Sequence, residues 1–231
     1  MTDHSKNDAR KRLELDAVAH MSLRDHVRQQ LRMAIISGRF GAGERLNERA
    51  IADELGVSTT PLKEAVRQLE GEGLIEILPR RGMVVRFDKE FAEEMILARA
   101  SLESPLAALA ADRADDASRE RMKATVNLMR KATAEADIDQ LIVLNEAFHG
   151  EIHRAARSRH LARMTAQQQF YDGSARRVIH RNEAESLRAL EEHAAICDAV
   201  TTGDADRAGE LMGKHVMRSG RLYLLAVFPM E

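Results

Sequence analysis

The chain has 231 residues, of which 44% are hydrophobic and 31% charged, a composition typical of a soluble globular protein with one large or two small domains. Four prolines, 2 tyrosines and no tryptophan, against 11 methionines, favour helices over strands. The single cysteine, Cys197, excludes an intrachain disulfide and fits a reducing compartment. No apolar run approaches the ~20 residues that a membrane helix needs, so we expect a cytoplasmic protein without a membrane partner.

The charge balance does not point to a nucleic-acid partner. Residues 1–88 hold 15 basic and 14 acidic side chains, and residues 89–231 hold 20 and 23, within a formal net charge of −2. A claim about nucleic acid must therefore rest on where the charges lie. Residues 1–20 are polar and charged without an apolar centre, so we expect a mobile N-terminal arm rather than a secretory signal.

Two short helices are predicted after the arm. Residues 23–38 carry apolar side chains at helical spacing, and Gly38 is a typical C-terminal stop. Residues 39–47 read as a loop. Asn47 can cap a second helix, which ends at Gly56.

A third helix and a hairpin follow. The helix carries Leu62, Val66 and Leu69 on one face and begins by Pro61, because proline is tolerated only in the first helical turn. After two glycines, the sequence LIEIL alternates like an edge strand, PRRG makes a turn and MVVRF returns as a second strand. The pattern changes near Asp88, so we expect a first domain over residues 21–88.

The second and third predicted helices are joined by a glycine turn, which is typical of a helix-turn-helix. The second helix of such a motif can lie in the DNA major groove. With the apolar face inward, the outward residues of the third helix are Thr59, Thr60, Lys63, Glu64 and Arg67. The hairpin would then be the wing of a winged helix, and its tip, Arg80-Arg81-Gly82, can enter a minor groove. Two alternatives remain open on the pattern alone: a helical cap with solvated charges, and a protein-contact module.

The same stretch resembles the DNA-binding domain of the GntR family of bacterial transcription regulators over about 65 residues. The matching landmarks are Gly38, Gly43, Leu46, Glu48, Ala52, Leu55, Thr60, Pro61, Glu64, Ala65, Leu69, Glu70, Gly73, Leu74, Pro79 and Arg81. The resemblance implies a nucleoid-associated repressor that binds a palindromic operator as a dimer. By position, it implies DNA contacts from Arg49, Thr59, Thr60, Lys63, Arg67, Arg80, Arg81 and Gly82.

Two positions depart from the family pattern. Thr59 and Lys63 stand where the family usually has arginine, and a lysine cannot reproduce the bidentate arginine fork. We therefore expect an operator that differs from the common one, with Arg49 and Arg67 carrying more of the readout.

From about residue 89 onward the sequence shows helical patterns and no strand signal. The predicted helices span roughly 89–113, 116–136, 138–157, 160–182, 184–202 and 204–227. Short breaks between them favour antiparallel neighbours. The predicted fold is therefore mainly α: a winged helix-turn-helix followed, over residues 89–231, by an antiparallel bundle for effector binding and dimerisation.

Four polar residues lie at apolar-looking positions of this half: Asn145, His149, His193 and His215. On spacing alone they are typical of hydrogen-bonded core residues, since the spacing does not match a local zinc motif. This half resembles the FCD ligand-binding domain of the FadR branch of the family, which implies that the four hold a divalent metal (Zn²⁺, Ni²⁺ or Mn²⁺). The family's usual first ligand is aspartate, so the asparagine should weaken binding. His153 shares the face of His149 but matches no ligand position, and we interpret it as a second-layer or surface residue.

Arg99 and Glu103 are one helical turn apart, where the family often has the same pair. The resemblance implies that Arg99 binds an effector, a small carboxylate that an arginine can grip bidentately. The alternative is a surface pair worth a few tenths of a kcal/mol, about the value for i,i+4 pairs. The count of six predicted helices resembles the VanR-type subgroup more than the FadR-type one.

The leading expectation is a homodimeric, ligand-responsive transcription regulator without catalytic residues. A second hypothesis is a helical metalloenzyme that acts on a small organic acid through a metal-bound water. A third is a protein-interaction module that uses the wing. DNA binding that falls steeply with salt separates the first from the other two.

Overall fold

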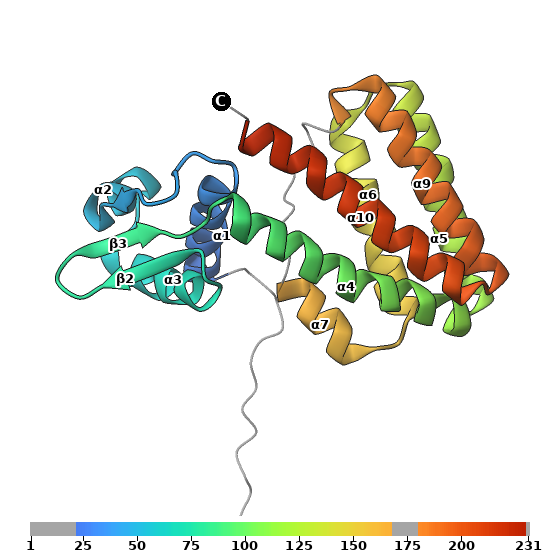
Figure 1. Ribbon diagram of the computed structural model, residues 1–231, viewed down its shortest axis with the longest axis horizontal. Helices are drawn as coiled ribbons and strands as arrows, with labels where there is room; N and C mark the ends of the chain where they lie inside the picture. Colours follow the sequence, from blue (N-terminus) through green and yellow to red (C-terminus); the bar gives the residue numbers. More distant parts are fainter. Residues whose placement is uncertain (1–21, 168–179, 230–231) are drawn as a thin grey trace, which may run out of the picture.

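The computed structural model describes residues 22–167 and 180–229, which form two regions joined by two long helices (Figure 1). The first region is a small mixed unit and the second is a bundle of helices. The helices that take part in both are α4 (Lys89–Arg113) and α10 (Ala205–Val227). The arm predicted at residues 1–20 lies outside the described residues.

The mixed unit is the predicted winged helix-turn-helix. Its elements are α1 (Leu23–Ile36), β1 (Arg45–Leu46), α2 (Glu48–Leu55), α3 (Thr59–Gly71), β2 (Ile75–Leu78) and β3 (Gly82–Val85). The three strands follow the order β1-β3-β2, with both pairings antiparallel. Strands β2 and β3 form the wing behind the two helices of the motif.

The start and end signals predicted for the two helices of the motif are confirmed. The side-chain oxygen of Asn47 accepts hydrogen bonds from the backbone N–H groups of Arg49 and Ala50 at 3.0 and 3.1 Å, which caps α2. Gly56 has a φ of 67°, so α2 ends in the left-handed conformation that glycine adopts without strain. Pro61 lies in the first turn of α3, where no intrahelical N–H bond is lost.

The prediction of a loop over residues 39–47 is wrong in one respect, because this segment contains the short strand β1. Arg45 pairs with Val84 and Leu46 pairs with Met83. Two residues are too few to show an alternating pattern, and their partner lies far along the chain, so local sequence does not indicate this strand. The pairing makes β3 the central strand and leaves β2 at the predicted edge.

The bundle contains α4, α10 and four further helices among the described residues. These are α5 (Asp116–Ala134), α6 (Ile138–Ala155), α7 (Arg159–Gln167) and α9 (Glu183–Thr202). The helix predicted over 160–182 begins as α7, and residues 168–179 of it lie outside the described part. The helix count and the subgroup drawn from it therefore stay predictions. Among the residues that the structure describes, no helix is both long and apolar enough to cross a bilayer.

Four of the five predicted breaks in the bundle coincide with helix starts that are capped by a side chain. Asp115, Asp137, Asn182 and Asp204 each accept a hydrogen bond from the backbone N–H three residues ahead, at 2.9–3.2 Å. Each such cap stabilises its helix by about 1 kcal/mol. Local capping therefore sets where the bundle helices begin.

Two hydrophobic cores share the long helices. Ile96 of α4 and Tyr223 of α10 belong to the core of the winged helix, and Leu106 of α4 belongs to the core of the bundle. Met217 packs against both cores. The Tyr223 hydroxyl donates a hydrogen bond to the Ile36 carbonyl at 2.6 Å, which ties α10 to the end of α1. Because α4 and α10 are buried in both regions, the two regions are joined by continuous packing.

Candidate functional site

The outward face of α3 is open to solvent. The three apolar residues predicted on its inner face are at most 2% exposed, whereas Thr60, Lys63 and Arg67 are exposed. Thr59, predicted to face outward, is half-buried at the first position of the helix. The polar face of this helix is therefore available to a groove without any rearrangement of the bundle.

Helix α2 adds an unexpected carboxylate beside this face. Lys63 Nζ lies 3.3 Å from Glu48 Oε1, so the two helices of the motif are joined by an ion pair. The pair is largely exposed, and such pairs contribute only about 0.2–1 kcal/mol. Arg49, next to Glu48, is exposed in the first turn of α2. A phosphate approaching Lys63 therefore has to compete with Glu48.

The wing presents its predicted tip to solvent. Arg80, Arg81 and Gly82 are all exposed, and the Arg81 N–H donates to the Leu78 carbonyl at 3.0 Å to close the turn. Both Arg80 and Gly82 have positive φ, 61° and 84°. A left-handed arginine costs roughly 1 kcal/mol, whereas a glycine adopts this conformation without strain. The turn projects two adjacent arginines from the end of the hairpin.

Three helices bring the predicted metal ligands together inside the bundle. Asn145 and His149 lie one turn apart on α6, His193 lies on α9 and His215 on α10. Each of the four is less than 10% exposed. One ring nitrogen from each histidine lies within 4.8 Å of the other two, and the ring centroids are 4.5–5.9 Å apart.

Two of these histidines are oriented by carboxylates that sequence reasoning did not place. His215 Nδ1 lies 2.8 Å from Glu192 Oε2, and Arg218 also contacts Glu192. His149 Nδ1 lies 3.4 Å from Glu103 Oε2. A carboxylate on Nδ1 fixes the ring and leaves Nε2 for a cation, an arrangement common around protein metals. Glu192 is next to His193 in sequence, but the histidine that it contacts, His215, lies on another helix. Spacing along the chain therefore does not reveal the contact.

Burial sets the protonation of this cluster. Burial lowers the pKa of His149 to about 4, so the ring is neutral at neutral pH, the form that binds metals. Burial alone would raise the pKa of Glu192, but hydrogen bonds from His215 and Arg218 hold it below its usual value. His149 is therefore neutral at neutral pH, and Glu192, the partner of His215, is ionised.

Asn145 is the predicted ligand that offers an amide oxygen instead of an imidazole nitrogen. It lines a cavity of about 10 Å³ together with His193, which is room for about one water. The donor set is three imidazoles and one amide oxygen, which suits a borderline cation such as Zn²⁺ or Ni²⁺ but lacks a negative charge. The residues present therefore fit a divalent cation, and the assignment of the four as ligands stays a prediction.

Arg99 and Glu103 lie in the interior, so the interpretation of this pair as a surface pair is wrong. Arg99 is 7% exposed and Glu103 is fully buried, with Arg99 Nη2 3.3 Å from Glu103 Oε1. Helix α4 is packed between other helices of the bundle, and this burial cannot be deduced from the local pattern. The other oxygen of Glu103 lies 2.8 Å from Nε2 of His153, which is half-buried.

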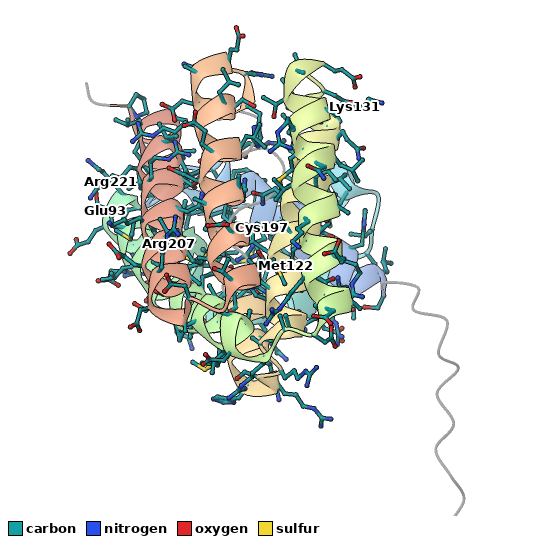
Figure 2. The ribbon with its side chains drawn as sticks, turned by 90° about the vertical axis from the view of Figure 1, so that its right-hand side faces the viewer. Glu93, Met122, Lys131, Cys197, Arg207 and Arg221 are labelled. Carbon is teal, nitrogen blue, oxygen red and sulfur yellow. The ribbon has the colours of Figure 1, made fainter. Side chains whose placement is uncertain are left out.

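Cys197 does not take part in this cluster. It is buried against the core, and Figure 2 shows it with Met122 between α9 and α5. Burial raises the pKa of the Cys197 thiol to about 11, so the thiolate that binds metals is disfavoured.

Two protein families match the chain, one on each region. Residues 23–85 match the bacterial regulatory proteins of the gntR family. Residues 94–218, more than half of the chain, match the FCD domain.

Relatives and solved structures agree with these matches. An uncharacterized HTH-type transcriptional regulator in an unstable DNA locus of Streptomyces ambofaciens is 30% identical over 81% of this chain and 79% of its own. The HTH-type transcriptional repressor GlaR of Escherichia coli (strain K12) is 29% identical over 81% of this chain and 89% of its own. The solved structure of E. coli McbR/YncC shares the fold with a TM-score of 0.67, at 21% identity over 88% of this chain and 98% of that one.

Proposed function

This chain belongs to the GntR family of bacterial regulatory proteins and carries an FCD domain, and from that premise we propose a dimeric repressor that responds to a small carboxylate. The chain is thus a transcription regulator rather than the metalloenzyme considered as an alternative. One observation carries the proposal: an exposed basic helix face and a buried polar cluster are joined by the same two helices, α4 and α10.

DNA binding is assigned to the outward face of α3. Thr60, Lys63 and Arg67 follow one another along the exposed side of a helix that the winged-helix geometry can place in a major groove. Arg67 can bind a guanine edge bidentately, whereas Lys63 offers a point charge for phosphate. The wing tip supplies further arginines for the minor groove. A dimer would present two such faces to a palindromic operator.

The buried cluster is assigned to metal and effector. Asn145, His149, His193 and His215 would hold a divalent cation, which when bound offers a Lewis-acidic position for a carboxylate oxygen. The carboxylates beside His149 and His215 hold the rings in position. Arg99, buried beside Glu103, supplies a positive charge for the effector.

Coupling between the two sites is assigned to the long helices. His215 and Tyr223 lie on α10, about 12 Å apart along the axis for a helical rise of 1.5 Å per residue. Tyr223 is hydrogen-bonded to the end of α1, in the core of the winged helix. Arg99 lies just beyond Ile96, which is in the same core. A ligand that shifts α4 against α10 would therefore move the winged helix of one protomer relative to the winged helix of the other protomer in the dimer.

The proposal is tested with DNA upstream of the chain's own gene. We expect a footprint over a short palindrome, and an affinity that falls steeply with salt because phosphate contacts release counterions. Light scattering of the protein alone and with DNA should report a dimer. A protein that binds random DNA of the same length equally well would contradict an operator function.

The effector is tested by linkage. A thermal-shift screen of small carboxylates, with and without Zn²⁺, identifies a ligand, and the operator affinity is then measured with and without it. Operator DNA must change the affinity for the effector by the same factor as the effector changes the affinity for DNA. Arg99→Lys should weaken effector binding. The operator affinity measured without effector should stay unchanged. A ligand that binds without changing operator affinity would contradict the regulatory role.

A further inference from the structure

Glu103, His149 and His153 form a second cluster of metal-ligating side chains, on the α4 side of the predicted one. A carboxylate oxygen and one nitrogen from each ring lie within 4.8 Å of one another. We propose that these three residues form a second binding position for a divalent cation, which shares only His149 with the position predicted at Asn145, His193 and His215. The proposal rests on the proposed function only in taking the bundle as the metal-binding region.

The donor set of this cluster is chemically suited to the task. Two imidazole nitrogens, from residues one turn apart on α6, face one carboxylate from α4. Two histidines and a glutamate are a known ligand set for Zn²⁺, and the same donors suit Mn²⁺ and Ni²⁺. Glu103 also provides the negative charge that Asn145 does not.

Both distances from Glu103 Oε2 are close to those of a metal site, and the two ring nitrogens lie within 4.8 Å of each other. In a tetrahedral site with bonds of about 2.0–2.2 Å, neighbouring ligand atoms lie about 3.4 Å apart. Glu103 Oε2 is 3.4 Å from His149 Nδ1 and 2.8 Å from His153 Nε2. The second distance is that of a hydrogen bond, so His153 has to withdraw by about 0.6 Å, less than the difference between two side-chain rotamers.

Polar side chains surround the buried carboxylate of Glu103. His149 Nδ1 and His153 Nε2 lie 3.4 and 2.8 Å from its Oε2. Arg99 contacts its other oxygen and keeps the group oriented, while its positive charge opposes the cation and makes the affinity moderate.

His153 is the residue through which this position meets solvent. Its side chain is 22% exposed, whereas the side chains of Glu103 and His149 are 0% and 7% exposed. A cation held there would reach water past His153. Three protein ligands also leave a fourth position open for water or for an oxygen of a carboxylate ligand.

The two positions exclude each other. A neutral imidazole has one nitrogen with a free lone pair and one N–H. His149 Nδ1 faces Glu103, so binding there leaves the other ring nitrogen protonated and unable to ligate a cation beside His193 and His215. Each chain should therefore bind one cation in total, at one position or the other.

The test removes the first position and keeps the second. The full-length double variant His193→Ala/His215→Ala retains Glu103, His149 and His153, and it is titrated with Zn²⁺ by calorimetry and with Co²⁺ by visible absorption. We expect about one equivalent to bind. Adding His153→Gln, which keeps a hydrogen-bonding side chain but is a poor ligand, should weaken binding by more than about 100-fold, because a direct ligand contributes more than the outer-layer partners whose loss costs about 10–100-fold. His160→Gln in the same background removes an exposed histidine of α7 and should change nothing.

Two results would overturn the proposal: a folded double variant that binds neither cation, or one whose affinity is unaffected by His153→Gln. Circular dichroism and thermal unfolding establish folding. If the double variant does not fold, His193→Gln replaces it, and the added effect of His153→Gln is read in the same way. Operator binding of each variant without metal is measured in parallel, so a failure of DNA binding is distinguished from a failure of this metal position.

Discussion

The winged helix and the bundle are built from the same kind of amphipathic helix, but they place the side chains of the two proposed sites on opposite sides of it. In α3 the apolar residues are inside, and Thr60, Lys63 and Arg67 are exposed. In the bundle the helices direct polar residues inward, and His149 and His193 are buried. A surface site needs only one helix with the right period, whereas an interior site needs several helices packed in one arrangement.

The difference matters because the two regions are not independent. Helices α4 and α10 contribute to both hydrophobic cores. A change at the buried cluster can therefore reach the exposed face through these helices, and variants of the shared core, the interior site and the surface site separate the three contributions.

The largest effect is expected at the contact that joins the two regions. Tyr223→Ala removes a fully buried ring and its hydrogen bond to Ile36, and should lower the free energy of unfolding by about 4 kcal/mol. Unfolding followed by denaturant should also separate into two transitions. Tyr223→Phe keeps the ring and should lose about 1 kcal/mol. If the two variants behave alike, the ring does not join the cores.

The next effect is a pH dependence that belongs to the interior site alone. The pKa of His149 is about 4 in the folded chain and near 6.5 when unfolded, so the unfolded state binds more protons between these values. Stability should therefore fall as the pH falls from 6.5 to 4, by up to about 3 kcal/mol. The charged and titratable groups facing the ring are Glu103, His193, His215 and Arg99. Denaturant unfolding with a chelator present measures the slope.

The control for this prediction is His149→Gln, which removes the titrating ring. Its stability should change less than that of the wild type between pH 6.5 and 4. Equal slopes for the two proteins would assign the pH dependence to other groups.

A smaller loss is expected at the surface site, and it should leave folding intact. Arg67→Ala should weaken operator binding by about 2 kcal/mol, roughly 30-fold, because it removes the proposed base contact. Helicity, dimer content and thermal stability should match the wild type. Arg207→Ala, an exposed arginine of the bundle that pairs with Asp198, is the matched control and should bind the operator normally. Unchanged affinity for the Arg67 variant would refute this orientation of α3.

The smallest effect tests the ion pair beside that face. Glu48→Gln releases Lys63 from its carboxylate partner and should change stability by less than about 1 kcal/mol. Operator affinity should rise a few-fold, by about 0.5–1 kcal/mol, because phosphate no longer competes with Glu48. The affinity is measured at several salt concentrations, since the gain should shrink as salt rises. Weaker binding would mean that Glu48 positions Lys63 for DNA.

Much of the fold could be predicted because the signals act over a few residues. Asn47, Pro61 and Gly56 mark helix ends through their own backbone and capping preferences, and the inner face of α3 follows from the helical period. The histidines on the bundle helices could likewise be chosen as candidates, since polar residues in an apolar stripe are unusual. The strand β1 could not be predicted, because its partner β3 lies far along the chain.

Apart from strand β1, the sequence by itself therefore determined the order of the described elements and the exposed face of α3, both of which depend on neighbours within about one helical turn. Only the tertiary structure decided that Arg99 is buried, that Glu103 faces both His149 and His153, and that Glu192 holds His215. These contacts join helices that are distant along the chain. Their geometry is set by how the helices pack, which residue spacing within one helix does not specify.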